Sequence, residues 1–161
     1  MRLRRLELAR YGRFTDAVID LGARRVGAPD LHILFGPNES GKSTAFSAWL
    51  DLLFGMRERH PYAFRHEWRR LRVAAVLEAG GRETTLVRVG ARGRDLLDAE
   101  DRPADPLALT SRLHGLTRES YRLMLSLDEE SLRQGGEAIL ASEGDLGRML
   151  FSAAAGLSHL S

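Results

Sequence analysis

Hydrophobic residues in the first hundred positions occur in short runs, several of them alternating with polar residues, which is a pattern typical of β-strands. Strands are predicted over residues 2–8, 17–21, 31–35, 71–78, 83–89 and 96–97. The run at 31–35 is almost continuously apolar and ends at Gly36, so it predicts a buried strand. Residues 79–82 read Ala-Gly-Gly-Arg, which predicts a hairpin between the two runs that flank them.

Hydrophobic residues spaced by three and four positions predict helices elsewhere in the chain. The helix expected over residues 43–54 places Phe46, Trp49, Leu50 and Leu53 on one face. Further helices are expected over residues 107–114, 117–124 and 145–155. Strands and helices together within 161 residues predict an α/β protein with one domain's worth of core.

The composition excludes several classes of protein. The chain has no cysteine, which excludes a disulfide framework and a cysteine metal site. No apolar run approaches the roughly 18 residues of a membrane span, and no apolar segment follows the basic N-terminus as in a signal peptide. These features predict a cytoplasmic protein without a membrane partner.

The net charge is only +2, but the charges are unevenly distributed. Residues 1–25 carry seven arginines against three acids, and residues 57–72 carry six arginines against two glutamates. Residues 95–145 carry twelve acids against five arginines. A basic face of this kind could meet nucleic acid, whereas an arginine-rich, solvated surface would explain the same counts.

One lysine occurs in the chain, Lys42, because the other 23 of the 24 Lys and Arg residues are arginines. It lies in the run Gly-Pro-Asn-Glu-Ser-Gly-Lys-Ser at 36–43, which fits the phosphate-loop pattern G-x-x-x-x-G-K-[ST]. A lysine is a point charge on a slim stem and can reach a β- or γ-phosphate from under a tight glycine loop. The motif, with an apolar run before it and an amphipathic helix after it, predicts a nucleotide site.

The residue types of this loop match what a phosphate requires. The predicted nucleotide-binding residues are Gly36, Pro37, Asn38, Glu39, Ser40, Gly41, Lys42, Ser43 and Thr44. The glycines permit tight turning, and the backbone N–H groups over residues 38–43 can surround an anion at a helix N-terminus. Lys42 is the predicted catalytic residue, the Ser43 hydroxyl the predicted Mg²⁺ ligand, and the Thr44 hydroxyl a donor to an α-phosphate.

Residues 34–44, Leu-Phe-Gly-Pro-Asn-Glu-Ser-Gly-Lys-Ser-Thr, resemble the G-P-N-x-S/A-G-K-S-T loop of ABC-type ATPases of the SMC and DNA-repair group. Residues 6–14 resemble the N-terminal strand and turn of that group. Leu-Phe-Gly at 53–55, Ser-Leu-Asp at 126–128, Gly-Gly at 135–136 and the run 143–151 are similar to the YhaN-like branch, a relative of the SbcC nuclease ATPases.

This resemblance implies the N-terminal lobe of an ABC-ATPase-like P-loop NTPase, an α/β fold in which a mixed sheet has an antiparallel portion and flanking helices. One ATP-binding lobe is expected over residues 1–161. Residues 1–56 would hold the N-terminal strands, the P-loop and its helix, and residues 57–102 the antiparallel portion. Residues 103–161 would be helical and lead toward a coiled coil that is missing from the chain.

ATP and Mg²⁺ are the implied cofactors of a DNA-repair ATPase. The implied partners are the C-terminal half of the head, a second head in a homodimer, DNA and, as an open alternative, a nuclease subunit. The signature motif and the Walker B acids belong to the C-terminal half in this family. The isolated chain is therefore expected to hydrolyse ATP weakly or not at all.

Two roles stay open for residues 126–134. As a Walker B segment, they would place Asp128 on Mg²⁺ and Glu129 on the attacking water, and the chain would be a self-contained small P-loop NTPase or kinase. As the Q-loop junction that the resemblance implies, they would offer Asp128 or Gln134 to the metal. A non-enzymatic lobe that binds DNA through its basic face is a third hypothesis.

The resemblance also implies that a basic residue in the turn after the first strand approaches the nucleotide phosphates. Arg10 and Arg13 are the candidates for this role, although both could equally be surface arginines. Between residues 57 and 70, aromatic and basic side chains could line adenine, contact DNA or pack under a long loop. His60 and His66 are six positions apart without an acidic ligand set, so no metal site is predicted there.

Overall fold

The computed structural model describes residues 1–24, 27, 29–125 and 133. By its internal contacts the chain divides into two compact units, Met1–Gly115 and Leu116–Ser161. The first unit contains the sheet, the predicted phosphate loop and the helix that follows it. Among the described residues, none of the helices combines the length and the apolar character that crossing a bilayer requires.

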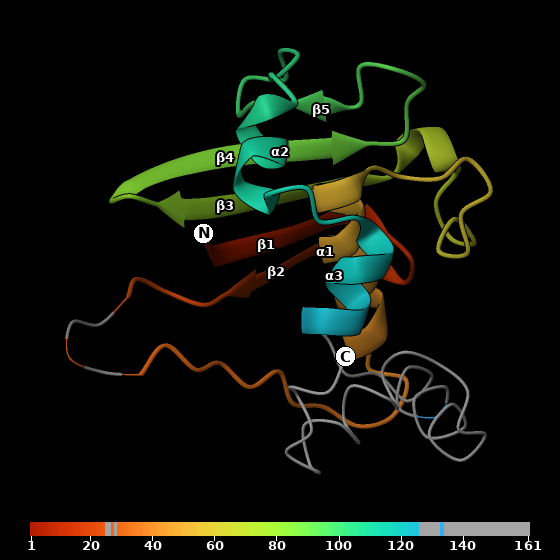
Figure 1. Cartoon of the computed structure of the whole chain (residues 1–161). Helices are drawn as coiled ribbons and strands as arrows, with labels where there is room; N and C mark the ends of the chain where they lie inside the picture. Colours follow the sequence, from red (N-terminus) through yellow and green to blue (C-terminus); the bar gives the residue numbers. More distant parts are fainter. Residues whose placement is uncertain (25–26, 28, 126–132, 134–161) are drawn as a thin grey trace, which may run out of the picture. The chain divides into compact units, whose positions relative to one another are not determined.

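A five-stranded antiparallel sheet forms the first unit, in the order β2-β1-β3-β4-β5 (Figure 1). Its strands are β1 (Arg2–Tyr11), β2 (Phe14–Asp20), β3 (Arg72–Ala79), β4 (Arg82–Val89) and β5 (Leu96–Leu97). The predicted hairpin is confirmed, since β3 and β4 are joined at Gly80 and Gly81. Leu8 of β1 lies opposite Ala17 of β2 and Val73 of β3. The N-terminal strand therefore joins β2 and β3, which are far apart from each other in the sequence.

Two parts of the predicted sheet are wrong for the described residues. Every strand pair is antiparallel, so these residues form no mixed sheet. Residues 31–35 form no strand but a loop between β2 and the first helix (Figure 1). Leu31, Ile33 and Phe35 are 76%, 82% and 93% exposed. An apolar run becomes a buried strand where a neighbouring strand forms hydrogen bonds with its backbone. None of the five strands of this sheet pairs with residues 31–35.

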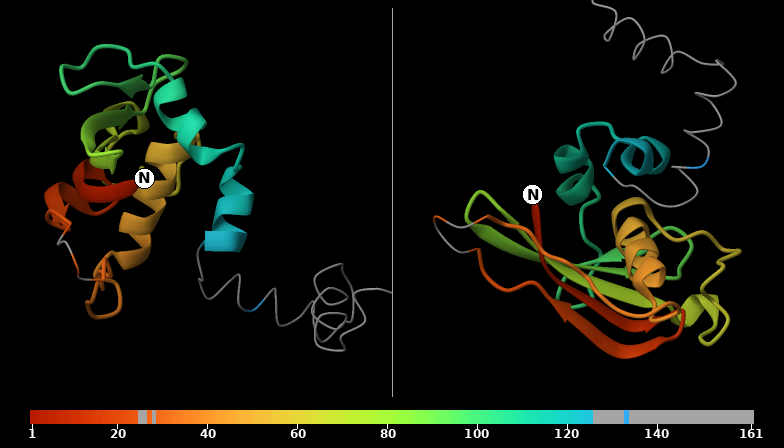
Figure 2. Two further views of the ribbon diagram at one scale, coloured as in Figure 1. Left: turned by 60° about the vertical axis from the view of Figure 1, so that its left-hand side comes forward. Right: turned by 90° about the horizontal axis from the view of Figure 1, so that it is seen from below.

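Helix α1 (Lys42–Phe54) follows the loop and confirms the helix predicted there. It buries Ala45, Ala48 and Leu52 and contacts β1, β3 and β4. The facing strands supply alternating side chains, such as Val73, Ala75 and Leu77 of β3, because successive strand residues point to opposite faces. Figure 2 shows α1 and the second helix of this unit, α2 (Leu107–Leu113), on the same face of the sheet.

The other predicted helices divide between the two units and the undescribed residues. Helix α2 and the short 3₁₀ helix η1 (Trp68–Arg70) belong to the first unit, and α3 (Arg118–Leu125) belongs to the second. Both α2 and α3 confirm helices predicted from hydrophobic spacing. The helix predicted over residues 145–155 lies outside the described residues.

The C-terminal end of α1 is tied to the sheet by a buried arginine. Nε and Nη2 of Arg88, on β4, donate to the backbone oxygen of Leu52 over 3.1 and 2.9 Å. Nη1 of Arg88 lies 3.1 Å from Oδ2 of Asp95. A cation is favourable where the last carbonyls of a helix point, so this contact fixes the orientation of α1 on the sheet.

Gly90 lies where two backbone segments approach each other. A Cβ built on Gly90 would overlap the backbone oxygen of Trp68 and lie 2.7 Å from its backbone carbon. We therefore expect Gly90→Ala to lower the free energy of unfolding by about 2–3 kcal/mol, because the backbone of η1 would have to move. Urea unfolding followed by the fluorescence of Trp49 and Trp68 measures this change.

Gly81→Ala is the matched control for this substitution. Gly81 has a φ of 73° and no other heavy atom within 4 Å of a built Cβ, so alanine there meets backbone strain of about 1 kcal/mol without a steric clash. Equal losses in the two variants would contradict the role assigned to the close approach at Gly90.

Candidate functional site

The phosphate-loop motif leads directly into the first turn of α1. Gly41 precedes the helix with φ 102° and ψ 16°, a left-handed conformation that favours glycine. The first turn contains no acidic side chain, and no side chain caps the helix at Gly41. The first N–H groups of a helix have no partners inside it, and they carry the positive end of the helix dipole. This end of α1 therefore suits an anion.

Lys42 is folded back onto the loop that precedes it. Its Nζ donates to the backbone oxygens of Gly36 and Pro37, each over 2.8 Å. These two bonds hold the ammonium beside the loop and close the chain from residue 36 to residue 42 into a ring. The contact of the predicted lysine with a phosphate stays a prediction, and these two bonds show only that its ammonium lies against the loop.

Two residues of the loop take left-handed backbone conformations. Glu39 has φ 63° and Gly41 has φ 102°. For Glu39, which has a Cβ, this conformation costs about 1–2 kcal/mol. Alternation between right- and left-handed residues turns successive N–H groups toward one point, which is the geometry of an anion nest. The loop keeps this strained shape because neighbouring elements support it.

The turn between β1 and β2 is one of these supports. Nη1 of Arg13 donates to the backbone oxygen of Glu39. A Cβ on Gly41 would overlap the ring of Phe14, which leaves room only for glycine. Of the two arginines predicted near the phosphates, Arg13 contacts the loop. Nε of Arg10 instead donates to the backbone oxygen of Arg70, 2.8 Å away, in η1.

The remaining loop residues are accessible from solvent. Pro37, Asn38, Glu39 and Ser43 are exposed, whereas Ser40 and Thr44 are half-buried. Among the described residues, no group of three or more His, Cys, Asp or Glu could hold a metal ion. Mg²⁺ accepts oxygen ligands and usually keeps waters and nucleotide phosphates around it, so the exposed Ser43 hydroxyl fits as a single protein ligand.

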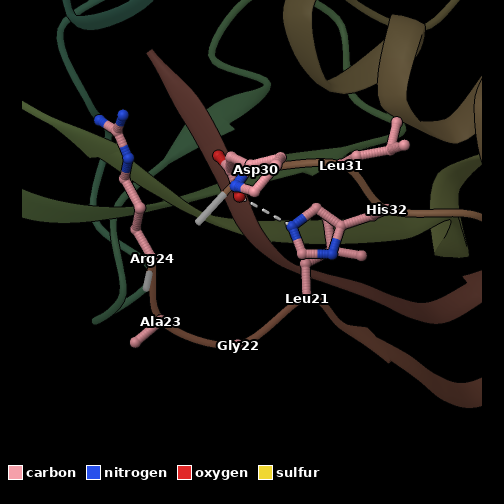
Figure 3. A pocket seen from close by; sticks show the side chains of 8 residues that line it. Leu21, Gly22, Ala23, Arg24, Asp30, Leu31 and His32 are labelled. Carbon is pink, nitrogen blue, oxygen red and sulfur yellow. Dashed lines mark hydrogen bonds and ion pairs between the residues drawn. The ribbon is translucent and has the colours of Figure 1, made fainter. Parts of the chain in front are cut away.

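The loop that enters the site is fixed by an ionic cluster at its beginning. Nε of Arg2 donates to Oδ2 of Asp30 over 2.7 Å, and Nε2 of His32 lies 3.0 Å from Oδ1 of the same carboxylate. Figure 3 shows His32 and Asp30 beside a pocket whose lining also includes Leu21 and Arg24. The hydrogen bond from Arg2, and then that from His32, lower the pKa of Asp30. The carboxylate therefore stays ionised and anchors the segment.

The whole chain matches a known protein family. A family model described as an AAA domain matches residues 1–161, the whole chain. The chain belongs to this AAA domain family. Membership establishes a P-loop, nucleotide-binding ATPase domain of the α/β class. Among curated proteins, none matches the chain significantly.

The AAA domain contains a buried polar cluster that the sequence did not predict. Oδ2 of Asp51, on α1, accepts hydrogen bonds from the Tyr11 hydroxyl and, over 2.5 Å, from Nε2 of His60. The Asp51 and His60 side chains are each 3% exposed. The backbone N–H of Tyr62 donates to Nδ1 of His60 over 3.2 Å, so both ring nitrogens are hydrogen-bonded. The one signal in the sequence was an aspartate within an apolar helical run.

Three predicted site residues of the AAA domain lie outside the described residues. Asp128 and Glu129, as Walker B acids, and Asp128 or Gln134, as metal-facing residues of a Q-loop, therefore remain predictions. The single ATP-binding lobe expected over residues 1–161 also remains a prediction. Of the aromatic residues predicted to pack under a loop, Tyr62 stacks on Tyr11, with ring centroids 5.5 Å apart.

Proposed function

We propose that this AAA domain is the ATP-binding N-terminal half of the head of an SMC-like DNA-repair ATPase. The observation that carries the proposal is the exposure of the apolar run at 31–35, directly before the phosphate loop. Leu31, Ile33 and Phe35 are all at least three-quarters exposed. Large apolar side chains in such a group mark a surface that another segment covers.

A strand from the C-terminal half of the head is the proposed cover for this run. Every second residue of it, from Leu31 to Phe35, is a large hydrophobic residue, which is the pattern of a strand face. Burying one such side chain contributes about 1.5–3 kcal/mol. Pairing would also bond the backbone that leads into Gly36, so the completed head would hold its phosphate loop more rigidly than this half alone.

ATP with Mg²⁺ would bind along the loop and the start of α1. The Lys42 ammonium would exchange its bonds to the oxygens of Gly36 and Pro37 for bonds to the β- and γ-phosphates. The first-turn N–H groups would donate to phosphate oxygens, and the Ser43 hydroxyl would hold Mg²⁺ together with them. Arg13, already at the loop, would add a second positive charge.

Hydrolysis would require groups from outside this half. The signature motif of a second head in a homodimer would close over the phosphates, and ATP would favour the engaged state through contacts that exist only there. Release after hydrolysis would then gate the access of DNA. The excess of arginines over acids within residues 1–25 of the sequence is the reason for proposing DNA as a partner, and a nuclease subunit would act beside the head.

The test mixes this chain with a matching C-terminal half of the head. We expect slow or undetectable ATP turnover by the chain alone and at least tenfold faster turnover in the mixture, because the water-activating acids arrive with the second half. Steady-state phosphate release measures both rates. A mixture no faster than the chain alone would contradict the half-head. Fast turnover by the chain alone, abolished by Asp128→Asn, would identify a self-contained NTPase.

A further inference from the structure

The segment of residues 60–66, the strap segment, is bonded to three consecutive residues, Gly12 and Arg13 of the β1–β2 turn and Phe14 at the start of β2. The backbone N–H of Gly12 donates to the oxygen of Tyr62 over 3.0 Å. Nη1 of Arg65 donates to the oxygen of Arg13 over 3.0 Å. Nε2 of His66 donates to the oxygen of Phe14 over 2.9 Å. The strap segment therefore determines where this turn lies.

The strap segment is itself anchored on α1, the helix that begins at Lys42. His60 donates to the buried Asp51 carboxylate, as described above. The Ser47 hydroxyl, also on α1, donates to the Tyr62 hydroxyl over 3.2 Å. A Cβ on Gly12 would lie 2.6 Å from Cγ2 of Thr44 and 3.3 Å from the Tyr62 ring, so the turn is pressed between helix and strap segment.

These contacts link the phosphate loop, α1, the strap segment and the β1–β2 turn in a closed series. The turn that the strap segment holds presents Arg13 to the Glu39 oxygen and Phe14 to Gly41. Glu39 and Gly41 are the two loop residues in left-handed conformations. The loop leads into α1, α1 anchors the strap segment, and the strap segment holds the turn. The turn itself contacts the strained part of the loop.

We propose that the strap segment is a positioning device for the nucleotide site, and that Arg65 positions Arg13 so that its guanidinium holds the phosphate loop in its anion-binding shape. The proposal rests on the proposed binding of nucleotide by this loop. Arg65 acts through the backbone of Arg13 and does not contact the loop in any described bond, which makes it a positioning residue. Its side chain is exposed, so replacing it leaves the core intact.

The test is a double-mutant cycle on the dissociation constant for ATP with Mg²⁺, measured by calorimetry on the whole chain. We expect Arg65→Ala to weaken binding about threefold to tenfold, the equivalent of one hydrogen bond, and Arg13→Ala to weaken it at least as much. In the Arg13→Ala background, Arg65→Ala should have no further effect. Arg65→Lys should restore most of the affinity, because lysine also donates to a carbonyl.

Arg59→Ala is the matched control, since Arg59 is exposed and its removal changes the net charge equally. We expect it to leave binding unchanged. An equal effect of Arg65→Ala in both backgrounds, or no effect in the wild-type background, would overturn the positioning role. If the wild type binds ATP and Lys42→Ala does not, either of these outcomes for Arg65→Ala overturns only the role of the strap segment, and the proposed function stands. If the wild type does not bind ATP, the proposed function and this inference are both wrong.

Discussion

Lys42→Ala should weaken the binding of ATP with Mg²⁺ by about 100-fold, because each charge-assisted hydrogen bond to a phosphate is worth about 1.5–3 kcal/mol. Lys42 is the only ammonium side chain in the sequence, so no second lysine can replace it. Its present bonds to the oxygens of Gly36 and Pro37 place the charge within the loop before any nucleotide arrives. Calorimetric titration of both proteins with ATP and Mg²⁺ gives the ratio of the dissociation constants.

Two control variants and one stability measurement separate the loss of a phosphate contact from the loss of charge or of folding. Lys42→Arg should also bind weakly, since a planar guanidinium does not fit where a slim ammonium passes under the loop. Arg59→Ala removes an equal charge from an exposed site and should bind normally. Urea unfolding of Lys42→Ala should still be cooperative, with a slightly lower midpoint because the bonds to the Gly36 and Pro37 oxygens are lost. Unchanged affinity in a folded Lys42→Ala protein would refute nucleotide binding by this loop.

Asp51→Ala should lower the free energy of unfolding by about 3 kcal/mol, the largest stability effect that we expect from a side-chain truncation here. The substitution removes the shared acceptor of the Tyr11 hydroxyl and of Nε2 of His60. Tyr11 is fully buried and the His60 side chain is 3% exposed, so water cannot replace the carboxylate without opening the core. Urea unfolding followed by tryptophan fluorescence measures the loss.

Asp51→Asn and Glu67→Ala are the comparisons for this substitution. Asparagine keeps one acceptor oxygen and nearly the same volume, so the loss should fall to about 1 kcal/mol. Glu67 is exposed, and its removal should change the free energy of unfolding by less than about 0.5 kcal/mol. A similar loss in all three variants would show that the buried cluster does not stabilise the fold.

Local pattern was sufficient for most elements of this fold. The helix from Lys42 to Phe54 and the hairpin around Gly80 are encoded by hydrophobic spacing and turn residues close together in the sequence. The strand predicted at 31–35 was wrong for the described residues. Hydrophobicity indicates that a run favours burial, but it does not identify the segment that would cover the run. The mixed sheet failed for the same reason, since all described pairs are antiparallel.

The candidate site was predictable to a similar extent. The motif alone indicates Gly36, Gly41 and Lys42 as candidate residues, because a phosphate loop is a local backbone structure. The supports of the loop were not predictable, since Arg13 and Arg65 act on backbone oxygens of residues 26 and 52 positions away. Contacts to backbone leave no trace in the identity of the partner residue, so the pattern of side chains cannot reveal them.

The bond from Arg88 to the Leu52 oxygen has a consequence for biosynthesis. Arg88 follows Leu52 by 36 positions, and the strap segment and β3 also come after the phosphate loop in the chain. As the polypeptide leaves the ribosome, the loop emerges before the elements that orient its helix and hold its turn. Contacts between distant residues form late in folding. A nascent chain should therefore acquire nucleotide affinity only after β4 has been synthesised.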